Sequence, residues 1–400
     1  MVFSILRPFL CFPAMGQKRL ENRRFLKYTW QERNFSVIMC EAGKMRVWPI
    51  NRQQKKRGRG SAPGVEKSAR VWRWITARKR CIVFLLFLFL LPNALMLASE
   101  LLYPANDTFR NWQAFYAQEK DSIDLLIVGG SHAYSSFDLD ILDEALDQKA
   151  FILASNSQTV TQTYYNVLEA LNYQSPKTIL LETFGINENN NWRYDPPGSE
   201  NYDKDWKKES NIDGMRFGLA KLKAIGAQYV RENWAYAFFR IARCHQNWKE
   251  PAQILSNLEF MRHQASTFQS FRPSKSAMTE EVVQQYADMP QSDDVFVASE
   301  ENVRHFHMLA ALCREKGIRL VLVMAPMYDG YIQKINYASR YEAIRQLAES
   351  ENLEYIDCNM CYAELGLEAR DFENAVYSYL HMNARGAAKV TAYVAERIRK

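Results

Sequence analysis

Residues 125–131 read Leu-Leu-Ile-Val-Gly-Gly-Ser, and this stretch constrains the fold more than any other part of the chain. Four consecutive apolar residues that stop at paired glycines are typical of a short strand buried on both faces of a parallel sheet. Open α/β sheets place their active sites at the carboxyl ends of such strands. Ser131 stands at that end, on a turn that the glycines permit, so it is the candidate nucleophile.

An alternation of strands and helices starts from this segment. Alternation with short connections predicts an α/β fold in three layers, with a parallel sheet covered by helices on both faces. The expected strands are 123–128, 151–154, 178–181, 319–324 and 354–356, and the expected helices are 138–148, 159–174, 299–316 (ended by Gly317), 338–351 and 384–399.

An uncharged apolar run occupies residues 81–98, directly after Arg78-Lys79-Arg80. Eighteen such residues are just enough to cross a bilayer as a helix, which predicts a single transmembrane anchor over 78–99. The positive-inside rule then leaves the N-terminus in the cytoplasm and the C-terminal domain outside it. A cleaved signal peptide is the rival interpretation, because small residues occur in 94–99, and a buried soluble helix is the third.

Basic residues are concentrated in and before this run. Residues 1–99 hold 20 Lys and Arg against 4 Asp and Glu, whereas residues 100–400 hold 31 against 41. Because the folded part is acidic, we expect no nucleic-acid partner. Residues 1–75 lack sustained periodicity, which predicts a mostly disordered cytoplasmic segment, and Met39 and Met45 leave a later natural start open.

The part beyond the anchor divides into three segments. Residues 100–186 and 299–400 carry the alternation, and residues 187–298 interrupt it with a mainly helical insertion rich in Trp, Asn and Arg. Within the insertion, His245 and Trp248 are candidates for a glycan-binding groove, although the same residues suit a helical core.

Cys358 and Cys361 form a C-x-x-C that suits either a disulfide or two half-buried thiols; without a second such pair we expect no metal site. No phosphate-binding loop or nucleotide fingerprint occurs, so no cofactor is predicted.

A serine nucleophile needs a base, and His381 is the best placed of the six histidines. It lies in a loop directly before the last expected helix, a loop that opens toward the carboxyl edge of the sheet. The alternative role for His381 is helix capping. His132 adjoins Ser131 in sequence, and neighbouring residues rarely point at one another, so we expect it to pack or to orient the turn.

Two sequence blocks carry a family resemblance. The first comprises Gly130-Ser131-His132, Tyr134 and Phe137-Asp138, and the last comprises Leu380-His381-Met382-Asn383, Gly386 and Lys389. They resemble the first and final blocks of SGNH/GDSL-type hydrolases. The membrane-anchored branch, with its alginate O-acetyltransferase-like proteins and teichoic-acid D-alanyl transfer proteins, is the most similar. The resemblance covers residues 121–186 and 300–398.

The resemblance implies an SGNH-like fold with a flavodoxin-like strand order, and a function. Ser131 would take an acyl group, with O-acetyl the first expectation, and His381 would act as base and then as acid. The protein would be a serine esterase or O-acyltransferase acting on a cell-surface polysaccharide of the bacterial envelope, with a polytopic membrane O-acyltransferase as partner. The oxyanion would be held by backbone N–H groups in the Gly130-Ser131 turn and at Ser157-Gln158, with Asn156 or Gln158 adding a side-chain donor.

One position departs from the family pattern. Ser378 stands three residues before His381, where the family has the aspartate that orients the histidine. Three interpretations follow. Asp371 or Glu373 replaces the aspartate; Ser378 and backbone carbonyls orient His381 in a dyad; or the domain is a catalytically inactive module that binds or presents a polysaccharide in an envelope synthesis complex.

Overall fold

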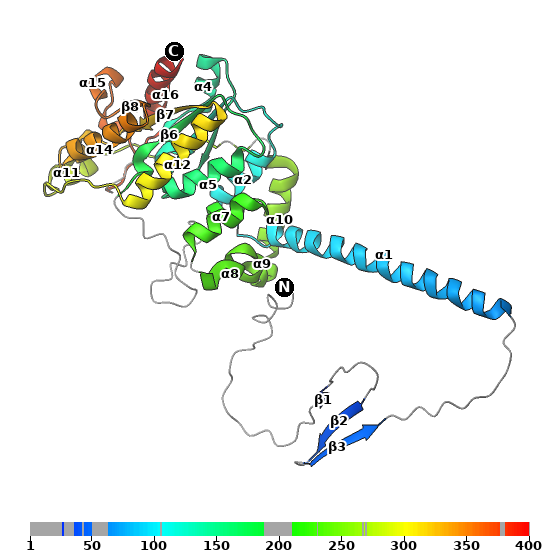
Figure 1. Ribbon diagram of the computed structural model, residues 1–400. Helices are drawn as coiled ribbons and strands as arrows, with labels where there is room; N and C mark the ends of the chain where they lie inside the picture. Colours follow the sequence, from blue (N-terminus) through cyan, green and yellow to red (C-terminus); the bar gives the residue numbers. More distant parts are fainter. Residues whose placement is uncertain are drawn as a thin grey trace. The chain divides into compact units, whose positions relative to one another are not determined.

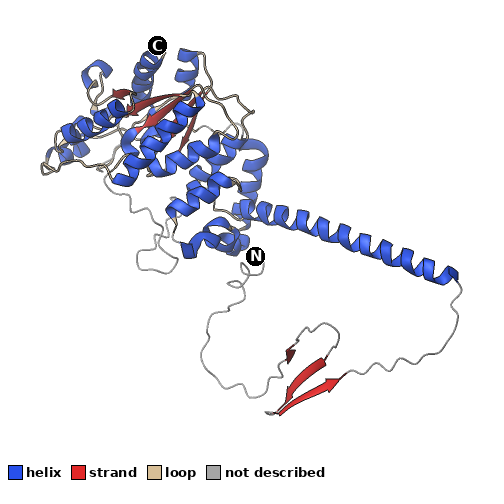
Figure 2. Ribbon diagram, in the orientation of Figure 1, coloured by secondary structure: helices blue, strands red, loops and turns tan. Residues whose placement is uncertain are grey.

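The computed structural model of the chain describes residues 26–27, 36–41, 44–49 and 63–399, apart from residues 105, 188–209, 230, 266–267, 269 and 377–380. The chain forms two units, residues 1–84 and residues 85–400. The elements are drawn in Figure 1, and their secondary structure is coloured in Figure 2.

The first unit contains a small antiparallel sheet. Its strands β1 (Leu26–Lys27), β2 (Ser36–Glu41) and β3 (Lys44–Pro49) pair in the order β1-β2-β3. These strands fall within the stretch that the sequence predicts to be mostly disordered, and the runs that include Val37, Ile38 and Val47 pair with one another in antiparallel register. The rest of residues 1–62 lies outside the described residues.

Helix α1 (Pro63–Leu101) begins well before the predicted anchor. Its segment Cys81–Leu101 is, among the described residues, the one helical stretch long and apolar enough to cross a membrane. None of the most apolar part is buried in the protein. Length and composition therefore permit a membrane anchor here, as the sequence predicts.

The second unit is built on a parallel sheet of five strands in the order β5-β4-β6-β7-β8. Every neighbouring pair is parallel, and the strand bounds lie within two residues of the predicted ones. Numbered along the chain this order is 2-1-3-4-5, the flavodoxin-like arrangement that was expected. The strands are β4 (Leu125–Gly129), β5 (Ala150–Ala154), β6 (Thr178–Glu182), β7 (Arg319–Met324) and β8 (Glu354–Asp357).

Helices cover both faces of the sheet, which confirms the three-layer α/β prediction (Figure 2). Alternate residues of each strand point to opposite faces, so Leu126 and Val128 enter one core while Leu125 and Ile127 enter the other. The first face carries α2 (Asp107–Tyr116), α5 (Val160–Ala170), α12 (Glu300–Lys316) and α14 (Tyr337–Ser350); the second carries α3 (Ser131–Ser136), α4 (Leu139–Leu146), α11 (Glu280–Ala287), α15 (Tyr362–Leu365) and α16 (Ala384–Ile398).

Local signals explain the helix ends. Thr159 and Gln162 form a reciprocal capping box at the start of α5, and Ser299 caps α12. Gly317 ends α12 in the left-handed conformation at φ 68°, as the sequence predicts.

The insertion is helical in its described part. Apart from α11, which belongs to the second face, it packs beside the first helical layer, where Trp112 of α2 lies against Gly214. Its helices are α6 (Ser210–Gly214), α7 (Leu219–Gln228), α8 (Trp234–Phe238), α9 (Ile241–Cys244) and α10 (Pro251–Glu259), with single turns η4 (Arg231–Asn233), η5 (His245–Lys249) and η6 (Phe260–Gln264).

Candidate active site

Ser131 lies at the topological switch point of the sheet. Strand β4 pairs with β5 on one side and β6 on the other, so the next two strands of the chain lie on opposite sides of it. Open α/β sheets bind their ligands at the carboxyl end of such a strand. Ser131 is the first residue of α3, a short helix capped by Gly130, rather than part of an open turn. Gly129 has φ 149°, a conformation that side chains rarely adopt, and it turns the chain sharply from strand to helix.

Glu182 supports this turn from the end of β6. Its carboxylate is fully buried and accepts a hydrogen bond from the N–H of Phe184 at 3.0 Å. Burial raises the pKa of Glu182 to about 7, although the amides of Phe184, Ala325 and Gly130 and the charge of Arg340 oppose the rise. Glu182 thereby links the carboxyl ends of β4, β6 and β7.

A dependence of stability on pH follows from this raised pKa. The protonated form of Glu182 is favoured by folding, so its contribution is complete below the unfolded value near 4.5 and is lost as the pH rises through about 7. We expect the free energy of unfolding to fall by about 2 kcal/mol from this group between pH 5 and pH 7. The measurement is denaturant unfolding of the full chain and of Glu182→Gln at both pH values.

The difference between the two proteins isolates Glu182. Buried His132 acts in the opposite sense, because its pKa is held well below the usual value and its contribution is lost as the pH falls. That contribution is present in both proteins and cancels in the comparison. Equal pH dependence in the wild type and in Glu182→Gln would contradict the assignment.

Tyr134 joins Ser131 to the neighbouring strand end. Ser131 lies one helical turn before Tyr134 and is close enough to help lower the pKa of the Tyr134 phenol, whose hydroxyl donates to Oδ1 of exposed Asn156. Burial raises the pKa of the Tyr134 phenol, and the charge of Arg272, whose guanidinium lies 4.0 Å from the ring centre, lowers it only in part. The phenol is thus a neutral donor that holds Asn156 beside Ser131.

His381 lies against the same tyrosine. Its ring centre is 6.2 Å from that of Tyr134 and 5.6 Å from that of His132. Ser131 and His381, which are 250 residues apart in sequence, therefore meet around one aromatic side chain. His132 itself is fully buried, stacked on Phe184 at 4.3 Å, and burial holds its pKa well below the usual value. His132 is thus a neutral packing residue, as its position suggested.

Glu373 is the carboxylate beside His381. Its Oε1 lies 3.2 Å from Nδ1 of the imidazole and accepts the backbone N–H of His381 at 2.9 Å. Burial alone would raise the pKa of Glu373, but the side-chain and backbone hydrogen bonds from His381 outweigh it and hold that pKa below its usual range. An ionised Glu373 at Nδ1 keeps the proton on that nitrogen and leaves Nε2 as the basic one.

Main-chain pairing brings Glu373 to this position. Phe372 and Met382 form an antiparallel bridge, and the N–H of Glu373 donates to the carbonyl of His381 at 2.9 Å. The loop that connects these two segments contains Ser378, which lies outside the described residues.

In the structure, Asp371 forms ion pairs with basic residues of α16 and does not serve as the carboxylate that orients His381. Its buried carboxylate accepts the N–H of Glu368 at 2.8 Å and pairs with Lys389 at 2.8 Å and Arg385 at 3.4 Å. Asp371 therefore ties the turn η8 (Ala369–Asp371) to α16, and Glu373, the other carboxylate that the sequence offered, contacts the histidine.

Gln158 is likewise engaged elsewhere. Its side chain belongs to a buried network with Ser155, Thr163, Asn166 and Asn211, and its N–H donates to the carbonyl of Ser155 at 3.3 Å. These hydrogen bonds stabilise the turn, and they leave the side-chain amide of Gln158 engaged instead of available to an oxyanion. Ser157 is exposed, in a left-handed conformation at φ 51°. Of these three turn residues, Asn156 is the one whose side chain bonds to Tyr134, whereas the backbone N and O of Gln158 lie within 4 Å of the Cβ position of Gly130.

A broad groove of about 1020 Å³ adjoins the cluster. Arg272, stacked on Tyr134, and Asn383, two residues after His381, both line it. Its other polar lining includes Ser274, Lys275, Ser276 and Arg385. The groove therefore reaches the site through Arg272 and Asn383, and neither Ser131 nor His381 is among the residues that line it.

The remaining predicted residues lie away from this site. His245 and Trp248 belong to η5 and are exposed, and neither lines the groove. Cys358 and Cys361 are free thiols. Over the described part of the chain, no group of three His, Cys, Asp or Glu side chains is arranged to hold a metal ion.

Two residues of the site, Tyr134 and Arg272, were not predicted from the sequence. Tyr134 appeared only as part of a motif, although its spacing of three residues from Ser131 on a helix would have placed the two on one face. Arg272 comes from the inserted segment, where no local pattern marks it. No protein-family model matches the chain, and no curated protein matches it.

Proposed function

We propose that the protein is a membrane-anchored serine esterase or O-acyltransferase of the SGNH type, acting outside the cytoplasm on acyl groups, first of all O-acetyl, of a cell-surface glycan. The observation that carries the proposal is the His381–Glu373 pair next to a serine at the switch point of a parallel sheet. The two sequence blocks and the apolar helix support it. A polytopic membrane O-acyltransferase remains the proposed donor-side partner.

Ser131, His381, Glu373 and Asn156 each have a separate role in the proposed reaction. His381 Nε2 removes the proton from the Ser131 hydroxyl as its oxygen attacks the acyl carbonyl, and Glu373 stabilises the resulting imidazolium. Asn156, whose Oδ1 is held by Tyr134, offers its amide hydrogens to the oxyanion together with the N–H of Ser131. The imidazolium then protonates the leaving oxygen. Water or a sugar hydroxyl, deprotonated by His381, takes the acyl group from Ser131 and regenerates the enzyme.

A fluorophosphonate probe tests the proposal, because it modifies only a serine that a neighbouring base activates. We expect one adduct on Ser131 when the full chain in detergent is treated and mapped by mass spectrometry. Ser131→Ala removes it, whereas Ser157→Ala, which alters an exposed serine on the adjacent turn, retains it.

The absence of an adduct on a folded protein would overturn the enzyme proposal. It would favour the alternative of an inactive module that binds or presents a polysaccharide. In that case, glycan binding would survive Ser131→Ala.

A further inference from the structure

The exposed apolar side chains of the domain are concentrated in the insertion. Among the described residues after Leu101, only four large exposed apolar side chains lie outside residues 217–255 of the insertion, namely Val295, Val297, Met360 and Val376. The other eight form what we call the apolar patch: Phe217, Leu219, Leu222, Trp234, Tyr236, Phe239, Trp248 and Leu255.

Ring and helix contacts make the α7–α8 part of the patch continuous. Leu219, Leu222 and Gly226 follow one another at helical spacing on the exposed face of α7. A Cβ on Gly226 would lie 3.7 Å from the ring of Trp234, so that ring covers the same face. Phe217, directly before α7, lies 6.4 Å from Phe239 at the end of α8.

The patch adjoins the end of the apolar helix. Arg240, next to Phe239, donates to Ser99 Oγ at 3.1 Å and pairs with Glu100. Figure 1 shows α9 and α10 beside the last turn of α1.

Side-chain amides of the insertion also bind the carbonyls that end α1. Asn257 donates to the carbonyl of Leu101 at 2.9 Å, and Asn247 donates to that of Leu102 at 3.0 Å. Trp248 follows Asn247 directly, and Leu255 lies two residues before Asn257. The insertion is therefore fastened to the chain where the apolar segment ends.

Charge around the patch is mainly positive. Of the side chains that the structure describes in this part of the insertion, the exposed acidic ones are Glu250 and Glu259, and the exposed basic ones are Arg216, Lys223, Arg231, Lys249 and Arg262. Trp and Tyr side chains concentrate at the headgroup level of bilayers, and basic residues attract anionic lipids. Aromatic, aliphatic and basic side chains on one surface are the composition of interfacial helices.

We propose that the apolar patch rests on the bilayer surface beside α1, with its aromatic side chains among anionic lipid headgroups. The proposal goes beyond the enzymatic one and rests only on α1 lying in a membrane. Two contacts, the helix and the patch, prevent rotation of the domain about α1. They therefore hold the sheet edge with Ser131 in one orientation toward the envelope.

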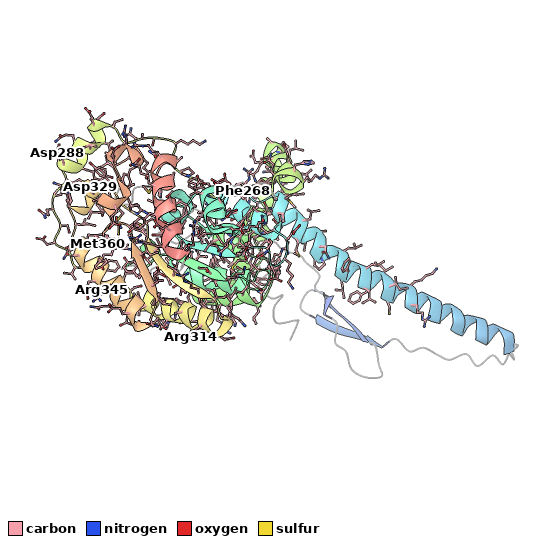
Figure 3. The ribbon with its side chains drawn as sticks, turned by 90° about the horizontal axis from the view of Figure 1, so that it is seen from above. Phe268, Asp288, Arg314, Asp329, Arg345 and Met360 are labelled. Atoms are coloured by element: carbon pink, nitrogen blue, oxygen red, sulfur yellow. The ribbon has the colours of Figure 1, made fainter. Side chains whose placement is uncertain are left out.

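Photocrosslinking from the patch tests this contact. The full chain is reconstituted in phosphatidylcholine nanodiscs containing phosphatidylglycerol, with benzoylphenylalanine in place of Leu222 or Leu255, both more than half exposed. Matched controls carry it at Val297 or Met360, which are 67% and 60% exposed. Met360 lies on the side of the domain remote from the end of α1 (Figure 3). A positive control carries it at Leu88 in the apolar helix.

We expect lipid adducts at Leu222 and Leu255 to exceed those at the two matched controls by about tenfold, because interfacial side chains contact lipid continuously. Lys223→Glu combined with Lys249→Glu should lower the yield in anionic discs. Adducts at the patch no more frequent than at Met360 would overturn the proposal.

Two other outcomes would also overturn it. If Leu88 gives no lipid adduct, α1 is not in the membrane and the basis of the proposal is lost. If the patch crosslinks to a protein in native membranes and to no lipid, a protein partner occupies it. Fluorophosphonate labelling of Ser131 is scored separately, so failure of either proposal is distinguishable from failure of the other.

Discussion

Replacing His381 with alanine should slow the reaction of Ser131 with a fluorophosphonate by about 10³-fold, within the usual range for loss of a general base. Glu373→Gln should slow it by about 10²-fold or more, because an amide neither stabilises the imidazolium nor enforces the Nδ1–H tautomer. The measurement is the second-order rate constant of labelling at pH 7.5, with the folded fraction checked by circular dichroism.

The neighbouring acidic residues provide the controls. Glu368 is half exposed and pairs with Arg370 and Arg385 near the same loop, so Glu368→Gln should label at the wild-type rate. Asp371→Asn should lower stability, because it breaks buried ion pairs, while the folded protein still reacts at a rate close to that of the wild type. Wild-type labelling by Glu373→Gln, or a larger rate loss in Asp371→Asn, would refute the assignment of Glu373.

Gly129→Ala should lower the free energy of unfolding by about 4 kcal/mol, the sum of backbone strain and overpacking. At φ 149° a side chain is strained whatever space surrounds it. A Cβ at this position would also lie 2.8 Å from the Cβ of Glu182 and 3.0 Å from its carbonyl oxygen. Denaturant unfolding of the full chain measures the loss.

Gly317→Ala separates the two contributions. Gly317 has φ 68°, but a Cβ there would meet nothing within 4 Å, so only backbone strain of about 1 kcal/mol is expected. Similar losses in the two variants would show that the approach of β4 to β6 is looser than the structure indicates.

The parallel sheet was predictable because its signals are local. Leu125–Val128 and Leu320–Val323 are apolar runs of strand length, and the helices between the strands carry their own caps at Thr159, Ser299 and Gly317. The position of Ser131 was predictable for the same reason, since a residue that directly follows a parallel strand lies at the carboxyl edge of the sheet. The small sheet β1–β3 was missed because basic residues surround its short strands.

The choice of partner for His381 was not predictable in the same way. Asp371 and Glu373 lie two residues apart, and the sequence did not separate them. The antiparallel bridge between Phe372 and Met382 turns Glu373 toward the imidazole, while Lys389 and Arg385 engage Asp371. Neighbouring residues in extended backbone point to opposite sides, but which residue faces His381 depends on register with a distant segment.

By itself, the sequence determined the α/β class, the position of Ser131 directly after a buried parallel strand, and an apolar helix of membrane-spanning length. These features depend on hydrophobic period, turn residues and composition, which act over a few neighbouring positions. Only the tertiary structure decided which side chains surround Ser131 and His381, namely Tyr134, Asn156, Glu373 and Arg272. It also decided that the insertion binds the end of α1. Those contacts join segments tens to hundreds of residues apart, and packing and register, rather than local preference, select them.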